Sequence, residues 1–231
     1  MKISIIIPTY NESKTIIEIL QKVNYEKGRV FDFEIIVVDD GSTDNTQELL
    51  NVNRDLFSTS LKHDSNQGKG AAVKTGLLVA NGDYILFQDA DLEYSPKDYN
   101  KIFDIVKQFN TDVVIGSRFK NSEFTKVLYF WNKVGNKIIT LLFNLLFNTT
   151  FTDIYSCYFL YRRDLINPEN IKTKGFNQQA ELLSKAVKKG TGFYEVPITY
   201  NGRTFKQGKK IKFYHIFGVI FTILINRFRK D

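Results

Sequence analysis

The sequence predicts one α/β domain with a mostly parallel central sheet and helices on both of its faces. Short apolar runs rich in β-branched residues, the pattern of buried strands, occur at residues 3–7, 34–38, 84–88 and 112–116. Apolar residues at helical spacing follow these runs at residues 13–23, 44–53, 68–80 and 95–109. This alternation is typical of a parallel sheet covered by helices. A length of 231 residues with 43% hydrophobic content suits one well-packed core.

After Arg118 the pattern changes to longer amphipathic segments. Residues 126–147 are rich in Leu, Ile and Phe, but polar residues interrupt them at helical spacing, which predicts an amphipathic helix and not a membrane span. The tail at residues 213–225 lies between basic residues and has two interpretations, an interfacial helix or a terminal helix docked on the core. We therefore expect a main domain at residues 1–212 and an amphipathic, basic-ended helix at residues 213–231.

Charge and cysteine content exclude some classes of protein. The excess of 32 Lys plus Arg over 25 Asp plus Glu gives a net charge of +7, which suits phosphate-bearing ligands, nucleic acid or an anionic membrane without choosing between them. The single cysteine, Cys157, excludes an internal disulfide and a cysteine-rich zinc site, and we expect it to be a small, partly buried packing residue. The apolar run that ends at Pro8 has no cleavage site after it, so we expect a strand and a cytoplasmic location.

The strongest chemical signal is Asp89-Ala90-Asp91-Leu92-Glu93, directly after the strand predicted at residues 84–88. In open α/β folds, ligands bind at this carboxyl edge of the sheet. Side chains alternate along an extended chain, so we expect Asp89, Asp91 and Glu93 on one side, as oxygen ligands for Mg²⁺ or Mn²⁺. The alternative is that they are N-terminal charges of the next helix, an arrangement less common for three carboxylates than for one.

Two further polar runs follow predicted strands and are expected at the same edge. Asp39 and Asp40 can accept hydrogen bonds from a ribose hydroxyl or a base N–H. In Pro8-Thr9-Tyr10-Asn11-Glu12, Tyr10 can lie along a base and Glu12 can bond to it. The sequence thus predicts a nucleotide site at this edge.

The run Gly68-Lys69-Gly70 belongs to neither of the common glycine-rich phosphate motifs. It lacks the third glycine of the dinucleotide fingerprint and the Lys-Ser/Thr pair of the P-loop. What is left is a helix N-terminus at which Lys69 either approaches a phosphate or simply begins the helix.

Taken together and in order, these motifs resemble family 2 glycosyltransferases, in particular the branch that transfers mannose or glucose to dolichyl or polyprenyl phosphate. The resemblance runs from Ile3 to about Lys212 and includes Gly116-Ser117-Arg118 and the run from Ser156 to Arg163. It implies a GT-A fold, which has a Rossmann-like, mostly parallel central sheet, and here we expect C-terminal amphipathic interfacial helices in addition.

The resemblance also implies roles for individual residues. Those implied to hold the donor nucleotide are Pro8, Tyr10, Glu12, Asp39, Asp40, Lys69, Asp89, Ala90 and Asp91. Glu93 stands where such enzymes often have Gln and is a third candidate metal ligand. Arg118, Arg203 and Lys209 resemble the cations that close over the phosphates, and charge-assisted bonds suit them to that role.

The implied reaction is inverting transfer of mannose or glucose from GDP-mannose or UDP-glucose to a polyprenyl phosphate, with Asp91, Arg118 and Arg203 in catalytic roles. An ionised phosphate acceptor needs positioning more than it needs a base. The alternative acceptor, a glycan hydroxyl, needs a base, for which Asp153 is the candidate, although it has an equally plausible structural role. Amides at Gln178 and Gln179 depart from the usual acidic pattern on the acceptor side and leave the acceptor open.

Partners and competing classes follow from the same features. Larger relatives carry transmembrane helices after the catalytic domain, so we expect this chain to contact the cytoplasmic membrane face through its amphipathic helices. A sugar nucleotidyltransferase would show a glycine-rich basic loop after the first strand in place of the run from Pro8 to Glu12. A peripheral membrane-binding or nucleic-acid-binding module would leave the two acidic clusters unexplained, because they repel phosphate without a metal. We expect no nucleic-acid partner, and the base, the sugar and the oligomeric state stay open.

Overall fold

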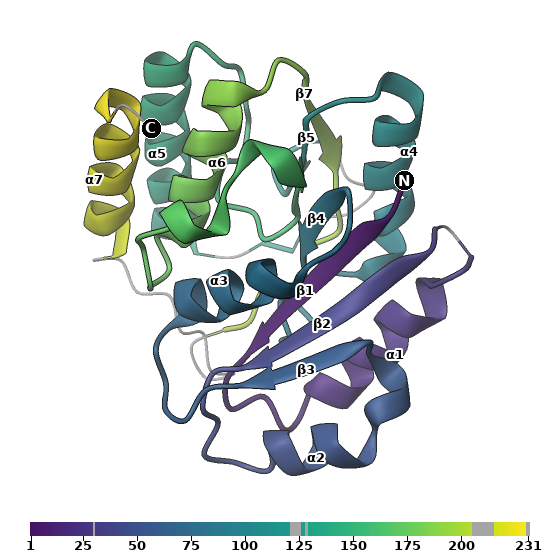
Figure 1. Ribbon diagram of the computed structural model, residues 1–231. Helices are drawn as coiled ribbons and strands as arrows, with labels where there is room; N and C mark the ends of the chain where they lie inside the picture. The colour runs from purple at the N-terminus through teal and green to yellow at the C-terminus, as the bar shows by residue number, and fades with distance from the viewer. Residues whose placement is uncertain (30, 121–125, 128, 205–214, 230–231) are drawn as a thin grey trace.

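The central feature of the fold is a seven-stranded sheet with the strand order β3-β2-β1-β4-β6-β5-β7 (Figure 1). The computed structural model describes residues 1–29, 31–120, 126–127, 129–204 and 215–229. The strands are β1 (Ile3–Thr9), β2 (Phe33–Asp39), β3 (Thr59–Lys62), β4 (Tyr84–Phe87), β5 (Val113–Ser117), β6 (Phe159–Arg162) and β7 (Phe193–Pro197). Of these described strands, β6 alone runs antiparallel to its neighbours β4 and β5. The sheet is therefore mostly parallel, as predicted.

Helices cover both faces of this sheet. They are α1 (Ile16–Glu26), α2 (Thr46–Val52), α3 (Lys69–Val79), α4 (Tyr99–Phe109), α5 (Phe130–Phe147), α6 (Gln178–Lys189) and α7 (His215–Phe228). Helix α3 lies so close to one face that a Cβ on Gly76 would come within 2.7 Å of Ile6. On the opposite face, the Tyr99 ring of α4 meets the Phe33 ring edge-on, with centroids 6.1 Å apart. Ile6 and Phe33 lie on opposite faces because Phe33 pairs with Ile3, three residues before Ile6.

The predicted elements are present, with shifts at their ends. The four predicted strands correspond to β1, β2, β4 and β5, and the predicted helices correspond to α1 to α5. Helix α4 begins at Tyr99 and not at residue 95, because residues Pro96–Asp98 form a separate 3₁₀ turn. Helix α5 begins at Phe130, four positions after the predicted start at residue 126. Strands β3, β6 and β7 and helix α6 were not predicted as elements.

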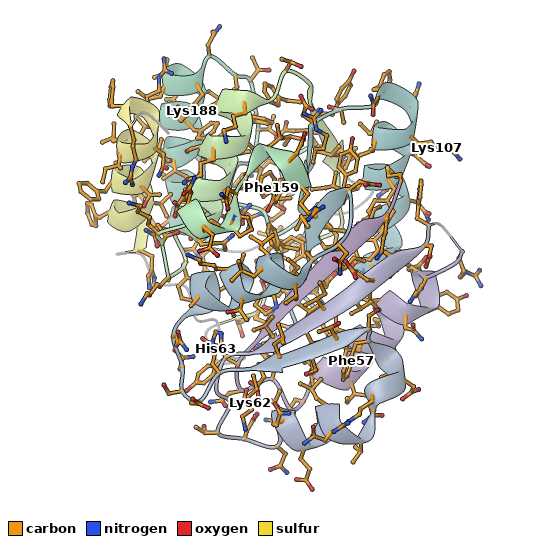
Figure 2. The ribbon with its side chains drawn as sticks, in the orientation of Figure 1. Phe57, Lys62, His63, Lys107, Phe159 and Lys188 are labelled. Atoms are coloured by element: carbon orange, nitrogen blue, oxygen red, sulfur yellow. The ribbon has the colours of Figure 1, made fainter. Side chains whose placement is uncertain are left out.

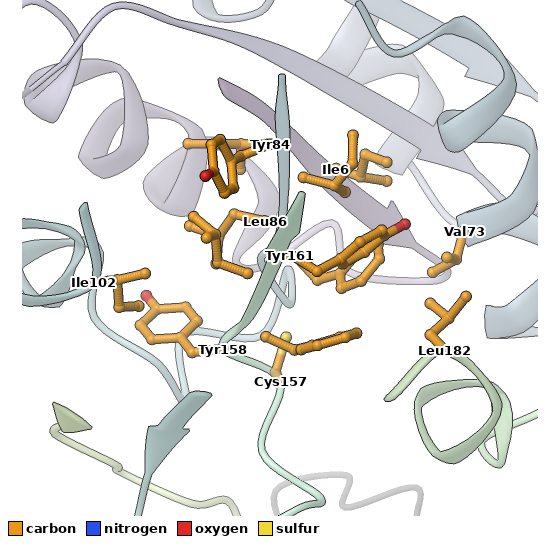
Figure 3. Packing of buried hydrophobic residues seen from close by; sticks show 14 of the residues in the cluster. Ile6, Val73, Tyr84, Leu86, Ile102, Cys157, Tyr158, Tyr161 and Leu182 are labelled. Carbon is orange, nitrogen blue, oxygen red and sulfur yellow. The ribbon is translucent and has the colours of Figure 1, made fainter. Parts of the chain in front are cut away.

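The core lies between the sheet and its helices and includes Cys157. Figure 3 shows Cys157 next to Tyr158 and below the strand that carries Tyr161. Cys157 is 5% exposed, which confirms the predicted packing role but makes the residue more buried than the partly buried position expected. In the same view Val73 of α3 and Leu182 of α6 face each other, so these two helices close the core on one side.

Helices α5, α6 and α7 form a separate layer at one end of the molecule (Figure 1). Val219 and Ile223 of α7 are buried. Asn177 donates to Thr222 Oγ1 at 2.7 Å, and Lys188 Nζ donates to the carbonyl of Asn226 at 2.8 Å. The described part of the predicted 213–231 helix is therefore docked on its neighbours.

Within the described ranges, none of the helices combines the length and the apolar character that crossing a membrane requires.

Candidate active site

The three polar runs predicted for the carboxyl edge of the sheet do meet there. Parallel strands β1, β2 and β4 end side by side at Thr9, Asp39 and Phe87, and a pocket of about 470 Å³ opens at this edge. The predicted site residues that line it are Pro8, Tyr10, Glu12, Asp40, Lys69, Asp89, Ala90, Asp91, Glu93, Arg118 and Arg203. Asp39 and Asp153 lie behind this lining, and Lys209 falls outside the described residues.

Lys69 reaches into the pocket from the first turn of α3. Its Nζ lies 2.5 Å from Asp89 Oδ1. Burial alone would lower the pKa of Lys69, but the adjacent Asp89 carboxylate raises it above its ordinary value, so the ammonium stays charged. The amides of Gly70 and Ala71 both donate to the carbonyl of Lys174, at 2.7 and 3.3 Å. At this helix start the lysine side chain lines the pocket, whereas these amides are bonded to Lys174.

The acidic turn does not form the three-carboxylate metal site that the alternation of side chains predicts. Leu92 has a φ of 63°, so the chain turns between Asp91 and Glu93 instead of staying extended. Among the described residues, no three His, Cys, Asp or Glu side chains are grouped so that they could hold a metal. The expectation that an extended chain sends all three side chains in one direction is therefore not met, and the assignment of Asp89, Asp91 and Glu93 as metal ligands stays a prediction.

Asp91 is nevertheless a carboxylate in an unfavourable electrostatic position. Burial, followed by the charges of Asp89 and Glu93, raises the pKa of Asp91 to about 7. Its Oδ1 accepts the backbone N–H of Glu93 at 3.2 Å. A cation next to Asp91 would relieve this repulsion.

Arg203 joins three segments of the site. Its guanidinium donates to the carbonyl of Asp91 from Nε at 3.1 Å and from Nη2 at 2.8 Å. The same group donates to Glu12, with Nη2 2.9 Å from Oε2. Glu12 is 8% exposed and also accepts the hydroxyl of Thr15 at 3.1 Å. The structure therefore pairs two residues, Glu12 and Arg203, that the resemblance assigned to different parts of the donor.

Arg118 is held from behind by Asp153. Its Nε donates to Asp153 Oδ2 at 2.7 Å, and its Nη2 donates to Oδ1 at 2.8 Å and to the carbonyl of Tyr155 at 2.9 Å. The Asp153 side chain has no exposed surface, whereas 11% of the Arg118 side chain is exposed at the pocket. A buried carboxylate bonded to an arginine at two points suits the structural role considered for Asp153 and does not suit a base.

Asp40 shapes the pocket wall through a residue that the sequence did not indicate. Its carboxylate accepts the N–H groups of Gln67 and Gly68, at 2.9 and 2.8 Å, and lies 2.7 Å from His63 Nδ1. The other ring nitrogen of His63 lies 2.9 Å from Thr75 Oγ1 in α3. Figure 2 shows Lys62 and His63 at the end of β3. Recognising β3 as a strand would have placed His63 at the carboxyl edge with the other motifs.

Asp39 has one carboxylate oxygen that is used and one that is not. Its Oδ1 accepts the N–H and the hydroxyl of Ser42, at 3.0 and 2.5 Å. Its Oδ2 is buried and has no hydrogen-bond partner within the described part of the chain. Such an acceptor is costly to leave unfilled and fits a ligand N–H or O–H.

The part of the same pocket that lies between the helices is richer in apolar side chains and was not predicted. It is lined by Trp131 and Ile139 of α5, by Ile216 and Val219 of α7, and by Phe176, which precedes α6, together with the polar Asn132, Asn136 and His215. One pocket therefore joins a charged end at the sheet edge to an apolar end between the helices. Tertiary packing creates this continuity, because α5 and α7 are about 70 residues apart in the chain.

Solved structures of other proteins share this architecture. The structure of Mycobacterium tuberculosis glucosyl-3-phosphoglycerate synthase aligns with 100% of this chain over 82% of its own length, at a TM-score of 0.74 and 18% sequence identity. The structure of Staphylococcus aureus TarS 1–349 in complex with UDP-GlcNAc aligns with 100% of this chain over 68% of its own length, at a TM-score of 0.62 and 20% sequence identity. The likeness shows the fold class, which is GT-A.

Within that class, the chain belongs to glycosyl transferase family 2, whose model matches residues 4–168. Dolichol-phosphate mannosyltransferase of Pyrococcus furiosus is 29% identical over 213 residues, which are 90% of this chain and 59% of that protein. Glycosyltransferase AglJ of Haloferax volcanii is 30% identical over 202 residues, 87% of this chain and 63% of its own length. The chain thus spans about three fifths of these two curated relatives.

A third relative is closer in length. The UDP-N-acetylglucosamine–dolichyl-phosphate N-acetylglucosaminyltransferase of Methanococcus voltae is 31% identical over 218 residues, which cover 85% of this chain and 84% of that protein. The family membership confirms the resemblance drawn from the ordered motifs.

Proposed function

We propose that the chain is a metal-dependent, inverting transferase that moves mannose or glucose from a GDP- or UDP-sugar to a polyprenyl phosphate. The observation that carries this proposal is the single pocket with a charged end at Asp91, Arg118 and Arg203 and an apolar end at Trp131 and Ile216. A lipid phosphate has the same division between a charged head and an apolar chain.

At the charged end, Asp91 is the residue best suited to hold Mg²⁺ or Mn²⁺. Mg²⁺ is commonly bound by one or two carboxylates together with substrate phosphates, so a site without three ready-made protein ligands still fits it. Asp89, already paired with Lys69, is the second candidate oxygen donor. A bound metal would stabilise the negative charge that develops on the leaving diphosphate.

The nucleoside end of the donor is assigned to the β1 and β2 edge. Pro8 and Tyr10 line the pocket there, and the unfilled Oδ2 of Asp39 is an acceptor for a ribose or base donor. Asp40 holds the pocket wall through its bonds to Gln67 and Gly68. Lys69 would face the diphosphate, and Lys209 keeps its proposed phosphate role from the sequence alone.

Positioning of the acceptor phosphate falls to Arg118. Its guanidinium is fixed by Asp153 and by the carbonyl of Tyr155, so little conformational entropy is lost when a phosphate binds it. A phosphate oxygen is already ionised and attacks the anomeric carbon without a base. Burial of Asp153 behind Arg118 supports this acceptor over a sugar hydroxyl, for which a base would be needed.

We also propose that α5 and α7 rest on the cytoplasmic membrane face. Helix α5 exposes Trp131, Ile138, Leu141 and Leu145, and α7 exposes Phe217, Phe221, Leu224, Ile225 and Phe228. Both sets recur at helical spacing and form one apolar stripe on each helix, which we call the exposed stripes. The exposed Lys133 and Lys137 on α5 would attract anionic headgroups. The names of the dolichyl-phosphate relatives support such a location.

The experiment is transfer from radiolabelled GDP-mannose, UDP-glucose and UDP-N-acetylglucosamine to short-chain polyprenyl phosphate, with Mg²⁺, with Mn²⁺ and with EDTA. We expect label from one donor to enter the organic phase only with a metal, and Asp91→Asn to block it. Donor binding without lipid labelling, followed by labelling of a soluble glycan, would assign the hydroxyl acceptor instead. Absence of any donor binding would refute the enzyme site.

A further inference from the structure

Glu93 makes a set of contacts that its position in the acidic turn does not suggest. Its Oε2 accepts the hydroxyl of Tyr200 at 2.7 Å, and its Oε1 accepts the backbone N–H of Arg203 at 2.6 Å. Its carbonyl accepts the N–H of Asn201 at 2.8 Å. Both carboxylate oxygens are therefore occupied by residues 200–203, which we call the arginine segment.

Besides Glu93, the arginine segment is held against the acidic turn by the Arg203 guanidinium, which donates to the carbonyl of Asp91 at 3.1 and 2.8 Å. Tyr94 and Tyr200 form an isolated antiparallel bridge, and their rings lie 5.1 Å apart. Lys126 Nζ donates to Asn201 Oδ1 and to the carbonyl of Gly202, both at 2.9 Å, but from an exposed position. The half-buried Glu93 carboxylate is the group that holds the backbone of Arg203 and the hydroxyl of Tyr200, and both of these bonds are charge-assisted.

The consequence of this anchoring is the position of two arginines. Holding the N–H of Arg203 places its guanidinium on the carbonyl of Asp91 and on Glu12. Holding Tyr200 places its ring 5.2 Å from the guanidinium carbon of Arg118. Glu93 thus positions Arg203 and sets an aromatic ring against Arg118, whose guanidinium is itself held by Asp153.

We infer that Glu93 is a positioning residue that fixes the arginine segment on the acidic turn, and that it is not a ligand of the metal. This inference rests on the proposed function, since it concerns how the same site holds its cations. Each Glu93 oxygen already accepts a hydrogen bond from the arginine segment, so a metal on either oxygen would compete with the N–H of Arg203 or the hydroxyl of Tyr200. Because the chain turns at Leu92, the Glu93 side chain points toward the arginine segment and not in the direction expected for an extended chain.

The test compares Glu93→Ala, Glu93→Gln and Tyr200→Phe with Asp91→Asn as the metal control. Two quantities are measured: the affinity for Mn²⁺ in the presence of GDP or UDP, from the resonance signal of free Mn²⁺, and hydrogen exchange in the peptide that contains the Asn201 and Arg203 amides. Neither measurement requires sugar transfer. Circular dichroism first establishes that each variant is folded.

We expect Glu93→Ala to speed exchange in this peptide by about tenfold or more while Mn²⁺ affinity stays within about threefold of the wild type. Glu93→Gln should restore part of the protection, because the amide keeps one acceptor oxygen. Tyr200→Phe, which leaves every carboxylate in place, should give a smaller increase in exchange. Asp91→Asn should show the opposite pattern, with Mn²⁺ affinity reduced by about tenfold or more and exchange unchanged.

Two outcomes overturn the inference. Loss of Mn²⁺ affinity in Glu93→Ala comparable to that in Asp91→Asn would make Glu93 a ligand. Unchanged exchange in both Glu93→Ala and Tyr200→Phe would show that the segment is held by other contacts. A wild-type protein that binds no Mn²⁺ with either nucleotide would instead refute the metal-dependent donor site, and the exchange comparison would still decide the anchoring.

Discussion

Arg118 and Asp153 form a two-point ion pair at the back of the pocket, with Nε–Oδ2 at 2.7 Å and Nη2–Oδ1 at 2.8 Å. The backbone N–H of Arg118 donates to the same carboxylate at 3.1 Å. Because the Asp153 side chain is fully buried, water cannot replace the arginine if the pair is broken. The pair therefore connects the stability of the fold to the cation that we assign to the acceptor phosphate.

Asp153→Asn should reduce the free energy of unfolding by about 2 kcal/mol or more, because it leaves the buried Arg118 charge without its counterion. Urea denaturation monitored by circular dichroism measures this. The matched control is Glu18→Gln, which breaks an exposed pair with Lys22 at 2.6 Å and should cost about 0.5 kcal/mol or less. Equal, small losses in both variants would contradict the structural role of Asp153.

Asp91→Asn should leave the fold intact and reduce metal-dependent sugar transfer by about 100-fold or more. The amide keeps the size of the side chain but removes the charge that would attract the metal. Initial rates over a Mn²⁺ titration measure the effect. Near-normal turnover at saturating Mn²⁺ and Mg²⁺ would refute the assignment of Asp91 to the metal.

Asp91 should also make the metal-free protein less stable as pH rises. Burial and the neighbouring carboxylates raise the pKa of Asp91 to about 7, whereas an unfolded aspartate titrates near 3.9. Between these values the folded state holds a proton that the unfolded state has lost, so the free energy of unfolding falls as pH increases from about 4 to about 7.

In EDTA, Asp91→Asn should therefore be more stable than the wild type by about 1–3 kcal/mol at pH 8, and the difference should shrink toward zero near pH 4. Urea denaturation of both proteins at the two pH values measures it. If the difference in the free energy of unfolding were the same at both pH values, the charge on Asp91 would not destabilise the folded protein.

The exposed stripes should be required for membrane binding. Phe221→Ser and Leu145→Ser remove side chains that are 64% and 74% exposed, so neither change should lower thermal stability much. Each should weaken co-sedimentation with anionic liposomes by about tenfold, since burying such a side chain contributes about 1.5–3 kcal/mol. The control, Val52→Ser on α2, removes an apolar residue of 73% exposure outside the stripes. Equal binding of all three variants to the liposomes would indicate that α7 has a structural role only.

Two glycines should respond in opposite directions to alanine. A Cβ on Gly70 would lie 2.5 Å from the carbonyl oxygen of Thr173, and that backbone cannot move without disturbing the pocket wall. Gly218 lies inside α7 with open space where a Cβ would be. Gly218→Ala should stabilise the protein by about 0.5–1 kcal/mol and Gly70→Ala should destabilise it. Thermal unfolding of both variants measures this, and stabilisation by Gly70→Ala would contradict the close approach.

The local sequence was sufficient to predict the strands that are buried on both faces of the sheet. Strands β1, β2, β4 and β5 appear as continuous apolar runs because helices cover both of their sides. Strands β3 and β7 lie at the two edges of the sheet, and their half-exposed residues do not form such runs. The reversed direction of β6 depends on its long-range pairing with β4 and β5, for which no local pattern exists.

The sequence by itself determined that carboxylates gather at one edge of a mostly parallel sheet, because strand direction and the position just after a strand are local properties. Only the tertiary structure decided what each charge contacts. Asp153 pairs with Arg118 and Glu93 anchors Arg203, over separations of 35 and 110 residues. The orientation of such side chains depends on turns, such as that at Leu92, and on packing between distant segments, which spacing along the chain does not specify.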